Sequence, residues 1–280
     1  MKRKKYIWEI IISCIVVGLL IYKFLPMDKI NSSKSTDDDT ALSFEKKMKP
    51  NKDYPEKEKV HLKLLDSIDY FKNVEGEFEE FDKLSNTKSK IDYVLDIENK
   101  KGMSSISENE SMNQTVIFNE GKKISFDNTS HTYREFKWEA KSKNKELTKL
   151  SPNQRFLNKT SNNNRTDGDF LGYASKSLQS DLASLLIRYT DWNFEESKFL
   201  DFDVYKLNGS IDKEISDSFS GKFEMIIDKN TGILLDFKNY DEEGNIKHSI
   251  TTNRININKG VDAKVFQKDI SQYKKIEKNV

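Results

Sequence analysis

Cysteine is nearly absent from this sequence, which limits how the chain can be stabilised and what chemistry it can perform. The single cysteine among 280 residues, Cys14, lies inside the one long apolar run. The rest of the chain therefore has no internal disulfide, no thiolate metal site and no thiol nucleophile. The domain that follows the apolar run must be stabilised by its core alone.

The motifs of common catalytic sites are also missing. The three histidines share no motif, and neither a His-Glu-x-x-His nor a Gly-x-Ser-x-Gly pattern nor a glycine-rich phosphate loop occurs. Residues 228–232 resemble the start of a calcium loop, but the glycine is at the fifth place, and Asn239 replaces the required bidentate glutamate. We therefore expect no enzyme, no bound metal and no cofactor, and we interpret residues 228–232 as a hairpin turn.

A strong charge of one sign is absent as well. Without residues 1–26 the chain holds 42 basic and 45 acidic residues, a net charge of −3. This balance does not favour binding to nucleic acid. Only 35% of the residues are apolar, which is low for a globular chain, although 11% are aromatic and each of these buries a large area.

The apolar run near the start is the most informative feature that is present. Residues 1–5 form a basic tail, and residues 6–25 are long enough to cross a bilayer as one helix. The basic start predicts that the carboxyl-terminal part lies outside the cytoplasm. We expect an uncleaved single-pass anchor in the cell membrane. A cleaved signal peptide, and a lipoprotein signal in which Cys14 is lipidated, remain alternatives.

The composition after the anchor indicates a linker and one domain. Residues 26–54 are polar and include three consecutive aspartates, so they cannot bury enough surface to fold. Residues 55–280 have helical apolar spacing over 55–71 and 175–189. Residues 141–169 form a polar loop or insertion, for which we favour disorder apart from one short helix near 154–157.

Alternation of apolar and polar residues predicts strands in the remainder of the domain. Residues 91–97 alternate clearly, the segments 116–118 and 124–126 flank a hairpin turn, and 133–138 is an aromatic strand. The last ninety residues indicate an antiparallel meander, with turns at 208–209, 228–232 and 241–244. Its strands are expected at 199–207, 222–227, 233–237, 246–252 and 254–258.

Four segments carry a resemblance to a known family. They are residues 61–76, Tyr-Thr-Asp-Trp-Asn at 189–193, residues 225–235, and residues 255–262 together with Phe266. With the order helix, sheet, helix, hairpins, this pattern resembles the LolA-like fold of lipoprotein carriers and of RseB- and MucB-type sensor domains. The likeness is greatest to membrane-anchored members in Gram-positive bacteria, some of them linked to sporulation.

This resemblance implies an α+β domain in which a strongly curved antiparallel sheet, an open half-barrel, is covered by helices. It also implies that the concave face binds acyl chains or a partner segment. The residues expected on that face and in the helices above it are Tyr93, Leu95, Val116, Phe118, Phe126, Phe136, Phe223, Leu235, Phe237, Leu64, Ile68, Leu182 and Leu185. The alternative is that these side chains only pack on one another and leave no pocket.

Two functions of the binding class follow from these observations. In the first, the domain holds a lipid, lipopeptide or lipoprotein segment at the concave face, close to the membrane. In the second, it is an envelope sensor or scaffold that contacts another membrane protein. The sequence does not choose the ligand, the protein partner, the pathway or the oligomeric state.

Overall fold

The computed structural model describes residues 53–109, 112–157 and 165–277. The chain divides into two compact units, Met1–Lys47 and Met48–Val280, and all described residues belong to the second. The predicted basic tail, anchor and nearly all of the linker lie outside the described residues. In the described part of the chain, no helix combines the length and apolar character needed to cross a membrane.

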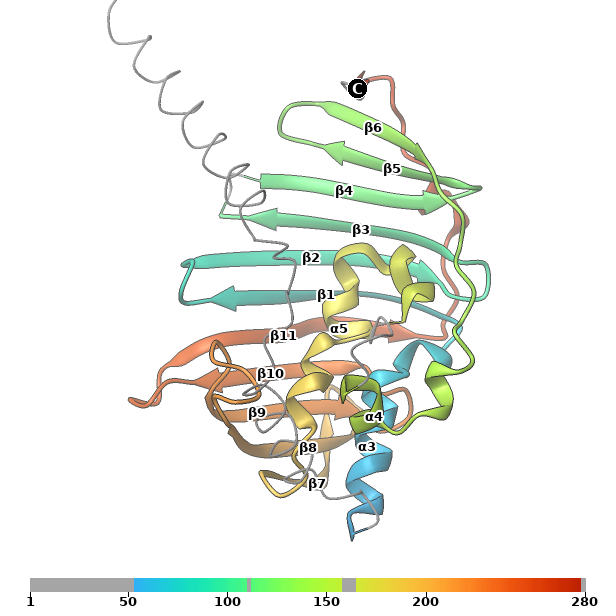
Figure 1. Cartoon of the computed structure of the whole chain (residues 1–280). Coiled ribbons are helices and arrows are strands. Elements are labelled where there is room, and N and C mark those ends of the chain that lie inside the picture. The colour runs from blue at the N-terminus through green and yellow to red at the C-terminus, as the bar shows by residue number, and fades with distance from the viewer. Residues whose placement is uncertain (1–52, 110–111, 158–164, 278–280) are drawn as a thin grey trace, which may run out of the picture. The chain divides into compact units, whose positions relative to one another are not determined.

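A curved, open sheet forms the framework of the second unit (Figure 1). Its spatial order is β12-β6-β5-β4-β3-β2-β1-β11-β10-β9-β8-β7, and all neighbours are antiparallel except β12 and β6. The strands are β1 (Asn73–Asp82), β2 (Thr87–Asp96), β3 (Lys101–Glu108), β4 (Met112–Asn119), β5 (Lys122–Asp127), β6 (Thr132–Lys137), β7 (Trp192–Phe199), β8 (Phe202–Ile211), β9 (Gly221–Asp228), β10 (Leu234–Tyr240), β11 (Ile246–Ile257) and β12 (Lys274–Lys275).

Short turns make most sequence neighbours into sheet neighbours, as predicted. Two pairings are exceptions: β12 pairs with β6, and β1 pairs with β11, which joins the two halves of the sheet. A bulge between Glu77 and Phe78 adjusts this long-range pairing. The predicted α+β class with a large antiparallel sheet is confirmed.

The strands of the last ninety residues differ from the sequence prediction in two places. Asn208 and Gly209 do not form a turn but lie inside β8, where they pair with β7. The two strands expected at 246–252 and 254–258 are one continuous strand, β11. The turn at 228–232 is confirmed, because the Asp228 backbone N–H donates to the Ile233 carbonyl oxygen and β10 follows directly.

Helices cover one face of the sheet, which we call the covered face (Figure 1). They are α3 (Pro55–Leu65), α4 (Pro152–Leu157), α5 (Ser175–Leu178) and the 3₁₀ helices η2 (Ser67–Asp69), η3 (Leu147–Lys149), η4 (Thr166–Ala174) and η5 (Asp181–Leu186). Pro55 begins α3, where its fixed φ suits a first turn. The predicted single helix at 175–189 is wrong, since α5 ends at Leu178 and the chain continues as η5.

Two glycines let η4 lie close to the sheet. A Cβ atom on Gly172, whose φ is +57°, would lie 2.4 Å from Ser104 Oγ and 2.7 Å from a Val116 methyl group. A Cβ atom on Gly102 would lie 2.1 Å from the Phe170 carbonyl oxygen. Both positions therefore require glycine, and the backbone of η4 replaces side chains as the filling above β3 and β4.

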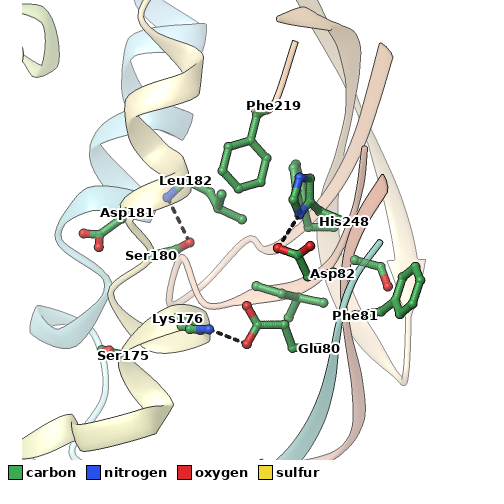
Figure 2. Close-up of a pocket in the computed structure, with 13 residues that line it drawn as sticks. Glu80, Phe81, Asp82, Ser175, Lys176, Ser180, Asp181, Leu182, Phe219 and His248 are labelled. Carbon is green, nitrogen blue, oxygen red and sulfur yellow. Dashed lines mark hydrogen bonds and ion pairs between the residues drawn. The ribbon is translucent and has the colours of Figure 1, made fainter. Parts of the chain in front are cut away.

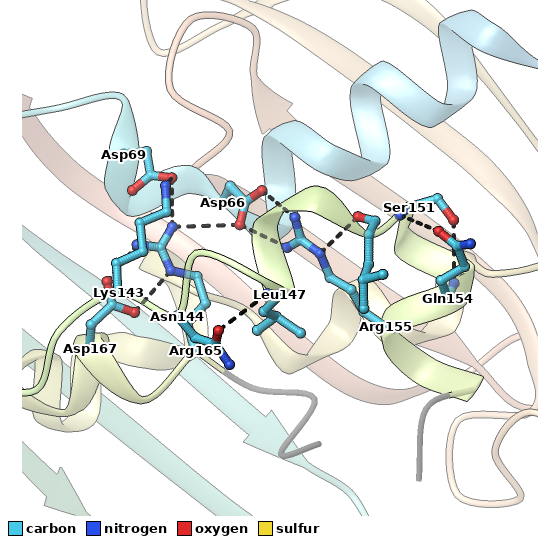
Figure 3. Close-up of polar contacts among 11 residues, drawn as sticks. Asp66, Asp69, Lys143, Asn144, Leu147, Ser151, Gln154, Arg155, Arg165 and Asp167 are labelled. Carbon is cyan, nitrogen blue, oxygen red and sulfur yellow. Dashed lines mark hydrogen bonds and ion pairs between the residues drawn. The ribbon is translucent and has the colours of Figure 1, made fainter. Parts of the chain in front are cut away.

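An ionic cluster attaches the segment around α4 to the first helices (Figure 3). The guanidinium of Arg155 donates to both carboxylate oxygens of Asp66 at 2.8 Å. Arg165 bridges Asp69 at 2.7 Å and Asp167 at 2.6 Å. Burial lowers the pKa of Arg165, but hydrogen bonds to Asp167 and Asp69 outweigh this and raise it. The guanidinium therefore stays charged at all accessible pH values.

This cluster overturns the expectation of disorder for the described parts of residues 141–169. The described parts of that segment hold the short helix α4, as predicted, and a side chain of Arg155 that is only 2% exposed. Asp66, which pairs with Arg155, and Asp69, which pairs with Arg165, lie about ninety residues earlier in the chain. Local composition could therefore not reveal that these cations would be buried.

The opposite face of the sheet carries a second, smaller core. Ile117, Phe126 and Tyr133 pack there against Phe266, which belongs to the 3₁₀ helix η6 (Ala263–Phe266). The chain then reaches the edge of the sheet, where the Lys274 and Ile276 N–H groups donate to carbonyls of His131 and Tyr133. The carboxyl-terminal segment thus covers the edge of β6, which would otherwise expose unpaired backbone groups.

Candidate functional site

Most of the predicted apolar residues are brought together by the fold, but in a closed core. Eleven of the thirteen belong to the main core or pack on its margin: Tyr93, Leu95, Val116, Phe118, Phe223, Leu235, Phe237, Leu64, Ile68, Leu182 and Leu185. Their side chains pack on one another and on the helices. Leu64, Leu95 and Leu235 are fully buried. Most of this face is therefore filled by packed side chains, which agrees with the alternative stated above, that these residues only pack on one another.

Two of the thirteen lie elsewhere. Phe126 faces the opposite side of the sheet, with its ring centroid 5.0 Å from that of Tyr273. The strand register explains this position. Phe126 pairs with Thr115, whereas the side chain of the next residue, Val116, points to the covered face. Phe136 is on the covered face but beyond the helices, and it is 36% exposed. Placing Phe126 on the concave face was wrong because alternation does not say which side the helices occupy.

One cleft enters the covered face between the sheet and the helices (Figure 2). Its volume is about 270 Å³. The sheet contributes Glu80 and Asp82 from β1, Phe237 from β10, and His248 and Ile250 from β11. These positions share one face because Asp82 pairs with His248, Glu80 with Ile250, and Phe237 with Ile250.

The helical side of the cleft is built from α5, η5 and the loop before β9. Lys176 lies on α5 and Leu182 on η5. The Ser180 hydroxyl accepts a hydrogen bond from the Leu182 N–H at 3.2 Å and begins η5. Phe219 comes from the loop, and its ring centroid lies 4.5 Å from that of His248. Of the predicted site residues, Phe237 and Leu182 line this cleft.

Two ion pairs stand beside the apolar wall (Figure 2). Lys176 Nζ contacts the Glu80 carboxylate, joining α5 to β1. His248 Nδ1 lies 3.3 Å from Asp82 Oδ2. The cleft therefore has an apolar wall of Leu182, Phe219, Phe237 and Ile250, and polar groups that are largely paired with each other.

The carboxylates of the cleft differ in their environments. Burial raises the pKa of Asp82, but the Ser85 N–H and the neighbouring His248 outweigh this and hold the pKa below its ordinary value. Burial raises the pKa of Asp181. Within the described ranges, no three histidine, cysteine, aspartate or glutamate side chains gather to hold a metal. The arrangement suits an apolar group flanked by polar atoms.

Sequence reasoning missed most residues of the cleft. Glu80, Asp82 and Lys176 are ordinary charged residues in a sequence that is 33% charged. His248 was noted only as one of three histidines without a motif. The pairing of β1 with β11 brings Asp82 and His248 together across 166 positions, and no local pattern indicates that pairing. The usable signals were Phe237, which lies two residues after the apolar Leu235, and Leu182, which belongs to the apolar stripe predicted for residues 175–189.

No family model and no curated protein matches this chain. Among solved structures, an uncharacterized conserved protein from Thermus thermophilus is similar over 78% of this chain and 96% of its own length, with 8% identity and a TM-score of 0.41. MucB of Pseudomonas aeruginosa, in the complex structure with MucA, is similar over 76% and 61%, with 13% identity and a TM-score of 0.40. The lipoprotein LppX of Mycobacterium tuberculosis is similar over 75% and 98%, with 12% identity and a TM-score of 0.37.

These structures include the MucB type that the sequence resemblance named. This chain spans about three fifths of the MucB chain. At such identities and TM-scores the likeness concerns the arrangement of the chain, and it carries nothing about ligand, partner or location.

Proposed function

We propose that residues 55–280 form a non-enzymatic, extracytoplasmic binding domain that residues 6–25 anchor in the cell membrane. In this proposal the cleft between η5 and strands β1, β10 and β11 takes the end of an apolar chain from a lipid, lipopeptide or lipoprotein segment. The observation that carries the proposal is the apolar wall of Leu182, Phe219, Phe237 and Ile250, which is open to a ligand while the core beside it is closed.

The size of the cleft supports a limited role for it. Ligand pockets commonly measure about 300–1,000 Å³, and this cleft measures about 270 Å³. It therefore suits one end of an acyl chain or one apolar side chain with its neighbours, not a whole lipid. Each buried methylene would contribute about 0.8 kcal/mol. A deeper ligand would require the helices to move off the sheet.

A photo-crosslinking experiment tests the proposal. The full chain is produced in bacterial cells with benzoylphenylalanine in place of Leu182, which lines the cleft. A matched control carries the same replacement at Leu200, which is 44% exposed in the turn between β7 and β8. We expect irradiation to give an adduct of defined mass at position 182 and not at position 200.

The mass of the adduct separates the two binding functions. A lipid adduct supports the carrier-like function, and a peptide adduct supports the alternative of a sensor or scaffold that contacts an envelope protein. If position 182 gives no more adduct than position 200, the cleft holds no ligand in cells and the proposal fails.

A further inference from the structure

A second depression lies on the covered face beyond the helices, over strands β4, β5 and β6. It measures about 370 Å³ and is lined by Gln114, Ser125, Asp127, Thr132, Arg134 and Tyr173, among others. We call it the β4–β6 groove. It is separate from the cleft described above, which lies on β1, β10 and β11. Three sheet neighbours, β1, β2 and β3, stand between β11 and the groove.

The register of the strands shows which side chains share the face that holds the groove, and the row that contains Lys123 lies just beyond the lining of the groove. Gln114 pairs with Asp127 and Asp127 with Thr132 in one cross-strand row. Val116, Ser125 and Arg134 form the next row, and Phe118, Lys123 and Phe136 the row after it. Successive rows are two residues apart along each strand, so all of these side chains are on one face. Arg134 and Lys123 are therefore diagonal neighbours.

Two cations of this face lack a carboxylate partner within the described residues. Lys123 Nζ lies 5.3 Å from the centroid of the Phe118 ring, and Arg134 is solvent-exposed beside Ser125. Diagonal neighbours of an antiparallel pair are about 7–8 Å apart, a distance that long side chains span. Both cationic groups can therefore approach one small anion from two sides.

The one carboxylate in the groove is already engaged. Asp127 Oδ1 accepts hydrogen bonds from the Ser130 N–H at 2.9 Å and the Thr129 N–H at 3.0 Å. These bonds lower the pKa of Asp127, with the Ser130 contribution the largest. The carboxylate therefore stays ionised, with its Oδ1 directed into the turn between β5 and β6, in the row on the other side of Arg134 from Lys123.

Neutral donors complete the groove. The Tyr173 hydroxyl donates to Gln114 Oε1 at 2.8 Å, which turns the amide group of Gln114 and fixes its orientation. The Ser125 hydroxyl lies in the row between Lys123 and Asp127, directly opposite Arg134. The glycine contacts that hold η4 against β3 and β4 place Tyr173 there.

We infer that the phosphate group of a phosphate ester binds at one end of the β4–β6 groove, held between the guanidinium of Arg134, which lines the groove, and the ammonium of Lys123 in the next row. A guanidinium alone satisfies both oxygens of a carboxylate through its fork. A phosphate group has further acceptor oxygens, which the ammonium of Lys123 and the hydroxyl of Ser125 can meet.

The test uses the full chain in a neutral detergent and a phosphate-free buffer at low salt, with affinity measured by calorimetry. Three probes distinguish the source of the phosphate: inorganic phosphate, glycerol 3-phosphate, and a short-chain phosphatidylglycerol below its micelle concentration. Acetate is the carboxylate comparison. We expect at least one phosphate probe to bind more tightly than acetate, and its affinity to fall as salt screens the two cations.

Three variants locate the site. We expect Arg134→Gln to weaken phosphate binding about tenfold, since a hydrogen bond between charged groups is lost, and Lys123→Gln to weaken it in the same direction. Lys137→Gln is the matched control, because Lys137 is on the same strand, points to the opposite face and pairs with Glu139. All three residues lie at the surface, and melting curves of the variants check that each still folds.

The inference fails if Arg134→Gln binds the probes as tightly as the unaltered chain, or if Lys137→Gln weakens binding equally. It also fails if acetate binds as well as every phosphate probe, or if none of the three binds. These measurements do not involve the cleft at Leu182. A negative result would therefore overturn the inference about the groove and leave the proposed function unaffected.

Discussion

Acidification from about pH 7.5 to pH 4.5 is expected to destabilise this domain through His61. This residue lies on α3 and is fully buried. Its Nδ1 lies 3.1 Å from the Tyr189 hydroxyl, and its ring stacks on Phe156 with centroids 6.0 Å apart. Burial lowers the pKa of His61 to about 3; it outweighs the raising effect of the Ala183 backbone, and the nearby charge of Arg155 adds a smaller lowering effect.

The sign and size of the effect follow from this pKa. Below the ordinary pKa of 6.5, the unfolded chain binds a proton at His61 and the folded chain does not. The domain therefore has its full free energy of unfolding above about pH 6.5. This free energy decreases as the pH decreases, and His61 causes no further loss below about pH 3. The slope is about 1.4 kcal/mol per pH unit. At pH 4.5 the loss in free energy of unfolding is therefore about 2–3 kcal/mol.

The measurement is urea denaturation of the full chain in neutral detergent at several pH values, followed by tryptophan fluorescence. Trp192 is a suitable reporter because it is buried and its ring lies 5.6 Å from that of Tyr189. The window from pH 6.5 to 5 lies above the ordinary range of aspartate and glutamate, so carboxylates contribute little there.

Two variants separate His61 from other causes. His61→Gln should remove most of the slope between pH 6.5 and 5, since its amide does not titrate. His131→Gln should keep it, because His131 is exposed. An unaltered chain whose stability is flat over this window would refute the reasoning, and so would a His61→Gln variant with the full slope.

Three further predictions concern packing, the ionic cluster and topology. Gly172→Ala should cost about 1–3 kcal/mol more than Gly244→Ala in urea denaturation, because both have positive φ but only Gly172 would create a clash; equal costs would contradict this. Asp66→Asn should cost about 3–5 kcal/mol by leaving Arg155 without its bidentate partner, and a double variant with apolar residues at both positions should cost less; a loss below about 1 kcal/mol for the single variant would contradict this. Alkaline phosphatase fused after residue 280 should be active in bacterial cells if the anchor has the proposed orientation, and a fusion that is produced but inactive would contradict it.

Elements with a strong local pattern were predicted from the sequence. The alternation in β2 and the turn residues between β4 and β5 and between β9 and β10 gave strands where the structure has them. The helix that begins at Pro55 was also predicted, although it ends at Leu65 and continues as η2. In these places the residue period and the turn chemistry act over a few positions, so a single sequence contains the information.

Strands with a weak local pattern were missed. In β3 the inward positions are filled by Gly102, Ser104 and Ile106, which do not form an apolar stripe. The small size of Gly102 and Ser104 is explained by η4, whose backbone lies directly above these two residues. The edge strand β7 is mostly polar and exposed after Trp192, so its sequence resembles that of a loop. Both are strands because their neighbours supply the hydrogen bonds.

By itself, the sequence determined the first helix, several of the antiparallel hairpins and most of the apolar residues that are buried, because the period of apolar side chains decides these locally. The tertiary structure alone decided which face the helices cover, and it joined Asp82 to His248 and Asp66 to Arg155. It also left a small cleft where the sequence suggested a broad concave face. Pairings across 80 to 170 positions depend on the relative placement of whole elements, and no short-range pattern records that placement.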